Sequence, residues 1–222
     1  MISHDVEVWG TIAFVGTLML ISAFSWLAQQ DRRERLMELA RQWGWTFSPL
    51  GDVEVEQEAG RLPLFQRGWR RCLTNAMAGT QDLLPMHLFD YELTVGAGRS
   101  ARTYRQTVAA CILKTSQSMP AFELRPKHLP GRLDALFGYH NIHFSTHHEF
   151  SSQYRLRGLD EAGLRRRFYL ELLHTLANRP GWSMEGEGEW LLIYRANHLV
   201  DSDDLPTFQH EAVRLVELLA QG

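Results

Sequence analysis

A group of histidines with one glutamate supplies the side chains best suited to metal chemistry. Imidazole and carboxylate are ligand types that zinc takes from proteins, at about 2.0–2.1 Å from the ion. Ile142 and Phe144 predict a strand, however, in which residues three apart point to opposite faces and residues four apart are separated by about 13 Å. We therefore predict no metal or cofactor here. A hydrolase or metal-dependent enzyme that uses this region remains the alternative hypothesis. The group consists of His140, His143, His147, His148 and Glu149.

Other catalytic and nucleotide-binding motifs are incomplete. His148-Glu149 begins like the H-E-x-x-H helix of zinc peptidases, but Ser152 stands in place of the second histidine. The stretch Gly96–Ala101 contains a G-x-G without a third glycine and opens no helical pattern, so a hairpin turn is predicted. The chain has no G-x-S-x-G elbow and no Walker lysine. Ser-His-Asp and Cys-His arrangements stay open, because their members can be far apart in sequence.

Two groups of arginines offer positive charge. Arg67, Arg70 and Arg71 surround Trp69, and Arg165–Arg167 form a run. Cations beside an aromatic ring can contact the phosphates of lipid or nucleic acid. Acidic residues precede the first group, and the second is typical of the solvated face of a helix. Because the net charge is −3, we predict no nucleic-acid partner that relies on a broad basic surface.

An uncharged stretch near the amino terminus determines where in the cell these groups are located. Trp9–Ala28 runs for twenty residues without a charged side chain. At about 1.5 Å per residue, such a helix covers the roughly 30 Å hydrocarbon thickness of a bilayer. Trp9 and Trp26 lie near its ends, where indoles favour the headgroup level. The sequence predicts a transmembrane anchor over residues 1–30, with the lipid bilayer as partner.

Charges beside the stretch predict its orientation. The charged side chains before the stretch are Asp5 and Glu7, and all nearby arginines follow it. By the positive-inside rule the amino terminus lies outside and residues 31–222 form a cytoplasmic domain at the bacterial inner membrane. A cleaved signal peptide would instead have a basic start and a shorter apolar core, and a buried core helix would need a larger protein around it. The positive charges are Arg32, Arg33, Arg35 and Arg41.

Periodicity in residues 31–222 predicts an α+β domain. Leu36, Leu39, Ala40 and Trp43 mark one helical face, and Gly44 ends that helix. The pattern then alternates with a period of two, which predicts an antiparallel sheet with helices packed on one face. Later helices are predicted from Asp160 to the region before Pro180-Gly181, and from Ser202–Pro206 to the end. Strands are predicted around Trp45–Phe47, Cys72–Ala78, Phe89–Leu93, Val108–Leu113, Ala121–Arg125, Ile142–Ser145, Gln153–Arg157, Trp182–Met184 and Trp190–Tyr194.

Two thirds of the chain, from about Leu62 to Arg195, resembles a family of uncharacterised bacterial proteins with one amino-terminal membrane span and a soluble α+β domain. The sequence departs from the family pattern at Leu93, Arg99 and Lys127. The resemblance implies the architecture and the anchor, and it implies no catalytic residues. It rests on Phe65 with Gly68, Asn75 with Gly79, Phe89-Asp90-Tyr91, Thr94-Val95-Gly96-Ala97-Gly98, Leu124-Arg125-Pro126, Gly138 with Ile142 and Phe144, Phe150, and Leu192-Ile193-Tyr194.

The expected function is that of a membrane-anchored cytoplasmic binding or assembly module with a protein partner. If the domain has a binding site, Asp90, Tyr91, Arg99 and Arg105 around the glycine loop are the candidates. The other interpretation of these residues is hairpin geometry with an ion pair. A further hypothesis is recognition of anionic lipid by the arginines that follow the anchor.

Overall fold

The computed structural model describes residues 2–113, 118–129 and 139–222, and it describes the side chains of α1 from residue 16 onward except those of residues 18, 21 and 25. Gly138, which contributes to the family resemblance, and the side chain of Trp9 lie outside the described part.

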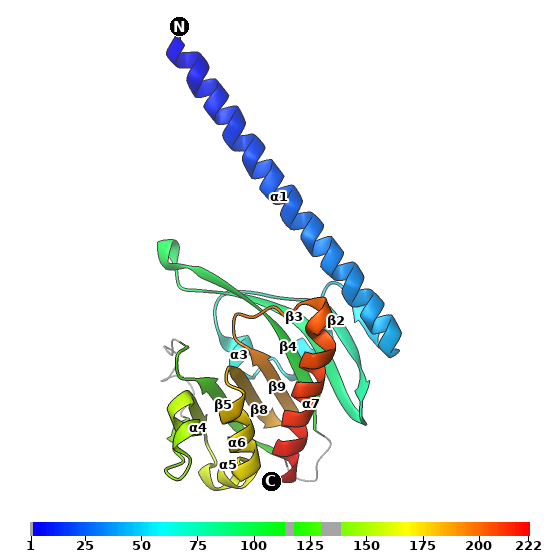
Figure 1. The fold of residues 1–222 in the computed structure, drawn as a ribbon, viewed down its shortest axis with the longest axis vertical. Coiled ribbons are helices and arrows are strands. Elements are labelled where there is room, and N and C mark those ends of the chain that lie inside the picture. The colour runs from blue at the N-terminus through cyan, green and yellow to red at the C-terminus, as the bar shows by residue number, and fades with distance from the viewer. Residues whose placement is uncertain (1, 114–117, 130–138) are drawn as a thin grey trace.

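The first helix is long and continuous. Helix α1 (Ile2–Trp43) contains both the uncharged stretch and the helix predicted after it. Gly44 ends it with φ +69°, a left-handed conformation that glycine adopts without a steric penalty. The amino-terminal half of α1 projects away from the rest of the molecule (Figure 1). Over the part of the chain with described residues, no helix meets the length and hydropathy needed to cross a membrane.

One antiparallel sheet organises the domain, as predicted from the alternating pattern. Its described strands number nine, in the order β1-β2-β3-β4-β9-β8-β5-β7-β6, and each neighbouring pair is antiparallel. The strands are β1 (Thr46–Ser48), β2 (Arg70–Gln81), β3 (Leu84–Val95), β4 (Arg102–Ile112), β5 (Met119–Pro126), β6 (His140–Ile142), β7 (Tyr154–Gly158), β8 (Trp182–Gly188) and β9 (Trp190–Arg195).

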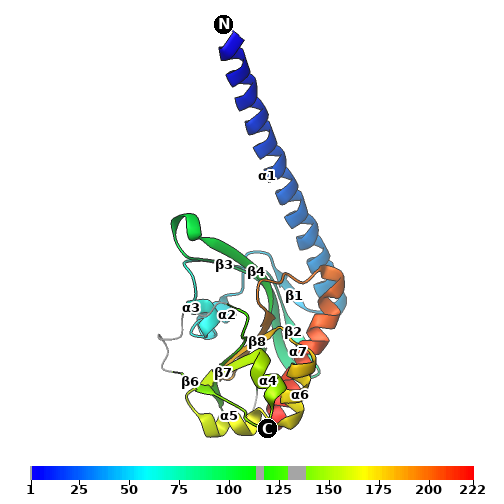
Figure 2. The ribbon, with the colours of Figure 1, turned by 60° about the vertical axis from the view of Figure 1, so that its left-hand side comes forward.

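Helices cover both faces of the sheet, so the prediction of helices on one face alone is wrong. One face packs against the end of α1 and against α4 (His148–Gln153), α5 (Glu161–Arg167), α6 (Leu170–Asn178) and α7 (Leu205–Gln221). The other face is covered by α2 (Val53–Glu58) and α3 (Pro63–Gln66), which bury Val55, Leu64 and Phe65 (Figure 2). These two helices are too short to show a helical period, which is why the sequence did not reveal them.

The helix predicted from Asp160 onward is two helices. Asp160 caps α5 as expected, accepting a hydrogen bond from the Gly163 amide. The chain leaves the helical conformation at Phe168, which is buried in the core and stacks edge-on against Phe122 at 5.3 Å. Because neither glycine nor proline marks this break, tertiary packing and not local propensity decides it. Short 3₁₀ turns, η1 (Gly98–Ser100) and η2 (Ser202–Asp204), complete the described elements.

Candidate functional site

The four residues predicted around the glycine loop do not form one site. Asp90 and Tyr91 are consecutive in β3, so their side chains point to opposite faces of the sheet. Arg105 in β4 pairs across the strands with Glu92, Nε to Oε2 at 2.5 Å, on an exposed surface. Arg99 lies in the exposed turn η1 at the far end of the β3–β4 hairpin. Whether any of them binds a ligand stays a prediction.

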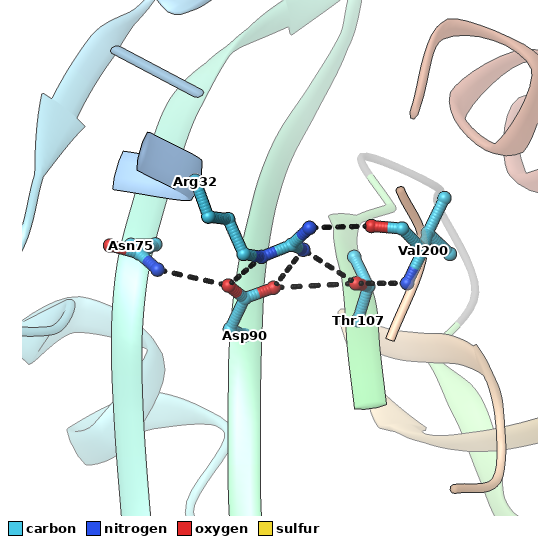
Figure 3. Close-up of polar contacts among 5 residues, drawn as sticks. All are labelled: Arg32, Asn75, Asp90, Thr107 and Val200. Carbon is cyan, nitrogen blue, oxygen red and sulfur yellow. Dashed lines mark hydrogen bonds and ion pairs between the residues drawn. The ribbon is translucent and has the colours of Figure 1, made fainter. Parts of the chain in front are cut away.

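Asp90 instead forms a polar clamp with the first helix (Figure 3). Arg32 of α1 donates from Nε to Asp90 Oδ2 at 2.8 Å and from Nη2 to Asp90 Oδ1 at 2.7 Å. Its third nitrogen, Nη1, donates to the Val200 carbonyl at 2.7 Å. Only 15% of the Arg32 side chain and 11% of the Asp90 side chain are exposed, so both charges are largely removed from water. A bidentate arginine–carboxylate pair is among the strongest and most directional polar contacts in proteins.

Two further residues complete the clamp. Asn75 Nδ2 donates to Asp90 Oδ2 at 3.0 Å. Thr107 Oγ1 donates to Asp90 Oδ1 at 3.3 Å and accepts from the Val200 amide at 3.0 Å. Asn75 has φ +52° beside the irregularity in the β2–β3 register, and this bulge turns its amide toward Asp90. The clamp therefore joins α1, three neighbouring strands and the loop before α7.

A second buried polar cluster lies on the opposite face of the sheet. Arg67, at the end of α3, forms ion pairs with Glu123 and Glu185 and donates to the Tyr194 hydroxyl at 3.0 Å. Tyr194 in turn donates to Glu185 Oε1 at 2.7 Å, and Glu185 Oε2 accepts from the Leu64 amide at 2.5 Å. Each charge has a partner of opposite sign, so the cluster fixes α3 against β5, β8 and β9.

Burial perturbs the titration of this cluster. Burial by itself lowers the pKa of Arg67, but the Glu185 carboxylate and its neighbours raise that pKa above its ordinary value. Burial raises the pKa of Glu123, although Arg67 opposes this shift. Burial and the Glu185 charge also raise the pKa of Tyr194. Arginine stays protonated and the tyrosine stays neutral at physiological pH, so both act in this cluster as hydrogen-bond donors to the Glu185 carboxylate.

The structure does not bring the predicted histidine group together. His140 and His143 flank the end of β6, His147 caps α4, and His148 and Glu149 open that helix. Among described residues, the one set of three metal-ligating side chains with atoms within 4.8 Å of one another is Asp52, Glu54 and His87. His87 Nδ1 lies 2.6 Å from Asp52 Oδ2, while Asp52 Oδ1 caps α2. Within this set Asp52 is the N-cap of α2 and His87 is its hydrogen-bond partner, and no spacing in the sequence indicated the set.

The members of each predicted arginine group have different surroundings in the structure. Arg67 is buried, Arg71 donates to the Phe65 carbonyl, and Trp69 remains 62% exposed. Arg165 pairs with Glu161 and lies 5.0 Å above the Phe144 ring. Arg167 is buried, so the prediction of a fully solvated run is wrong at this position.

Tyr91 lines a small cavity on the face of the sheet that α2 and α3 cover. The cavity measures about 260 Å³, and Phe65 and Leu73 contribute apolar wall. The Tyr91 hydroxyl is buried and has no hydrogen-bond partner among the described residues. Burial accordingly raises the pKa of Tyr91.

With the geometry in view, the chain can be compared with known proteins. No protein-family model matches the chain, and no curated protein matches it. A solved structure, that of the mycobacterial trehalose monomycolate transport factor A, TtfA, is similar with a TM-score of 0.59 and 14% sequence identity. The alignment covers 84% of this chain and 91% of that chain. At this identity the similarity concerns the fold.

Sequence reasoning missed Arg32 as part of a site because its position after an apolar stretch suggested a role at the membrane surface. Asp90 alternates with Phe89 and Tyr91 in the predicted strand, a pattern that predicts a solvent-exposed carboxylate, so the sequence carried no signal that Asp90 is buried and paired with a cation.

Proposed function

We propose that this protein is a single-pass membrane protein whose cytoplasmic α+β domain is a non-enzymatic binding or assembly module. The observation that carries the proposal is a row of large apolar side chains on the projecting half of α1. Met19, Leu20, Phe24, Trp26 and Leu27 are between 58% and 76% exposed. Such an apolar surface is unfavourable in water and is expected to contact a partner or a membrane. The uncharged stretch Trp9–Ala28 is long enough to span the hydrocarbon core of a bilayer.

The arrangement of the clamp supports a module whose position depends on its anchor. Leu36 and Ala40 of α1 are buried in the main core, and Arg32 is tied to Asp90 just before them. The helix therefore enters the domain as a rigid continuation and not through a flexible linker.

An open groove on the side away from α1 is the surface that we assign to a protein partner. It measures about 560 Å³ and lies along α6, facing Arg214 of α7. Leu170 at its edge is 58% exposed, and His174 and Arg179 line it beside Arg214. Glu171 also lines the groove and Arg179 pairs with Glu211 at 3.0 Å, so Arg214 is the basic side chain that, with the exposed Leu170, suits an amphipathic segment with acidic residues.

Two measurements test the proposal. After cell lysis the protein should sediment with membranes, resist extraction by carbonate, and dissolve in detergent. From the detergent extract it should retain a reproducible partner, and Leu170→Asp with Arg214→Glu should abolish this retention. Leu83→Asp, at the 93% exposed turn between β2 and β3, is the matched control and should retain the partner. Recovery in the supernatant without detergent would contradict the anchor.

The enzymatic alternative has its own test. If the purified protein contained stoichiometric zinc or iron and turned over a substrate, and if the double substitution His147→Ala, His148→Ala abolished that turnover, the protein would be an enzyme and not a binding module. We expect this double variant to keep the partner of the wild-type chain, because His147 precedes α4, His148 begins it, and neither lines the groove.

A further inference from the structure

The β3–β4 hairpin ends in a basic tip with one exposed indole. We define the hairpin tip as Trp69, Arg70, Val95, Arg99 and Arg102. Arg99 and Arg102 lie in the turn region, and Arg70 pairs across the strands with Thr94 near the end of β3. Trp69 is tied to the turn, because its indole Nε1 donates to the Gly96 carbonyl at 2.8 Å. The tip thus combines the ends of β2, β3 and β4. The register places Arg70, opposite Thr94, and Arg102, opposite Val95, on opposite faces of the hairpin, so the tip presents positive charge on both faces.

The charge of this tip is unbalanced. No side-chain hydrogen bond or ion pair reaches Arg70, Arg99 or Arg102 from any residue that the structure describes. No acidic residue occurs between Leu93 and Gln106, whereas the whole chain has a net charge of −3. Three free guanidinium groups on a negatively charged protein mark a local preference for an anionic partner.

The position of the tip indicates which kind of anionic partner it could contact. From the clamp, α1 runs about 6 Å back from Arg32 to Ala28, the last residue of the uncharged stretch. Strand β3 runs about 17 Å from Asp90 to Val95 at the tip. Both elements leave the clamp toward the same side of the molecule, and the tip is the part of the domain that reaches furthest toward the amino-terminal end of α1 (Figures 1 and 2). Because the tip reaches at least as far from the clamp as Ala28 does, the surface of a bilayer around Trp9–Ala28 would contact the tip.

We infer that the hairpin tip is a second membrane contact, in which the three arginines bind the headgroups of anionic phospholipid and Trp69 lies at the interface. The inference rests on the proposed anchor. An indole has an apolar ring and a polar edge, which favours the headgroup region, and each arginine near an anionic surface contributes about 1 kcal/mol. Two contacts, one by α1 and one by the tip, would fix the tilt of the domain on the membrane.

The test uses the full-length chain reconstituted in vesicles, with an environment-sensitive fluorophore at the tip. Ser100→Cys carries the probe in a Cys72→Ser background, because Cys72 is an exposed thiol and Cys111 is buried. Vesicles of phosphatidylcholine are compared with vesicles that also contain phosphatidylglycerol. We expect a blue shift and several-fold weaker quenching by iodide in the anionic vesicles alone. The matched probe at Leu83→Cys, on the opposite end of β3, should show no difference.

Charge removal separates the possible outcomes. The triple variant Arg70→Gln, Arg99→Gln, Arg102→Gln should fold normally, since these side chains have no intramolecular partners in the described chain, and it should lose the difference between the two lipids. Each substitution should weaken tip docking about fivefold. For the chain with all three arginines intact, retention in the vesicles with equal quenching in both lipids would overturn the inference alone. Loss of the protein from the vesicles would overturn the anchor and, with it, this inference.

Discussion

The carboxylate of Asp90 accepts hydrogen bonds from three other residues, while that of Glu92, two positions along the same strand, has one exposed partner. Asp90→Asn keeps the size of the side chain but leaves the largely buried Arg32 without its counter-charge. We expect the free energy of unfolding to fall by about 2–3 kcal/mol. Glu92→Gln, the matched control, should cost less than about 1 kcal/mol, because its ion pair is exposed.

Chemical denaturation in detergent, followed by tryptophan fluorescence, measures both changes. Equal losses for the two variants would show that the clamp contributes no more than a surface pair.

The two cysteines differ in accessibility by an amount that a labelling experiment can resolve. Cys72 is exposed on β2, whereas Cys111 is fully buried on β4, and burial raises the pKa of the Cys111 thiol well above its ordinary value. Because the thiolate is the reactive species, Cys111 should be inert in the folded protein. A thiol reagent at pH 8 should therefore modify one cysteine per native chain and two after unfolding. Rapid modification of both in the native protein would contradict the burial of β4.

At the scale of elements, Gly79 determines how the end of α1 meets the sheet. A Cβ atom at this position would lie 2.2–2.5 Å from atoms of the Trp45 ring, which is itself 5.3 Å from the Trp43 ring. Gly79→Ala should force Trp45 from its site and lower the free energy of unfolding by about 1–3 kcal/mol. Near-ultraviolet circular dichroism should report the change at the tryptophan pair.

The control for this substitution is Gly16→Ala. An added Cβ there meets no atom within 4 Å, so the unfolding of the domain should stay as in the wild-type chain. If Gly79→Ala also left unfolding and the spectrum unchanged, the contact between Trp45 and β2 would not anchor α1.

Some elements could be predicted from the sequence, and others could not, for physical reasons. The long apolar run at Val108–Leu113 indicated the burial of β4 directly. The alternation at Phe89–Leu93 predicted a solvent-exposed face that includes Asp90, and this was wrong, because Arg32 of α1 covers Asp90 and β3 is buried on both faces there. The strand predicted at Ile142–Ser145 instead ends at Ile142, since Phe144 packs against α4 through Phe150. Local patterns of three or four residues carry too little information to separate a strand from a loop whose side chains fill a core.

At the scale of the whole molecule, the decisive contacts join residues that are far apart in sequence. Arg32 and Asp90 are separated by 58 residues, and Arg67 and Glu123 by 56. The pairing of β4 with β9, which makes one sheet of all the strands, is likewise non-local. Periodicity indicates which face of an element is buried but not which element covers it. For this reason the sequence predicted the α+β class correctly, whereas the clamp and the sheet order emerged only from the structure.

The orientation of the whole molecule in a membrane can be tested by moving charge across the predicted anchor. A green fluorescent protein fused after Gly222 should fluoresce, and alkaline phosphatase at the same point should be inactive, if the domain is cytoplasmic. The variant with Arg33→Gln, Arg35→Gln and Arg41→Gln, combined with Ser3→Lys and His4→Lys, reverses the positive charge around Trp9–Ala28. It should shift a large part of the population to the periplasmic orientation, with active phosphatase.

Arg32 is kept in this variant because the clamp needs it, so misfolding of the domain does not confound the result. The variant with only the three glutamine substitutions is the control, and it should shift the population less because it gives the amino terminus no positive charge. Active phosphatase on the unmodified chain would place the domain outside the cytoplasm. It would also place the exposed Cys72 thiol in the oxidising periplasm.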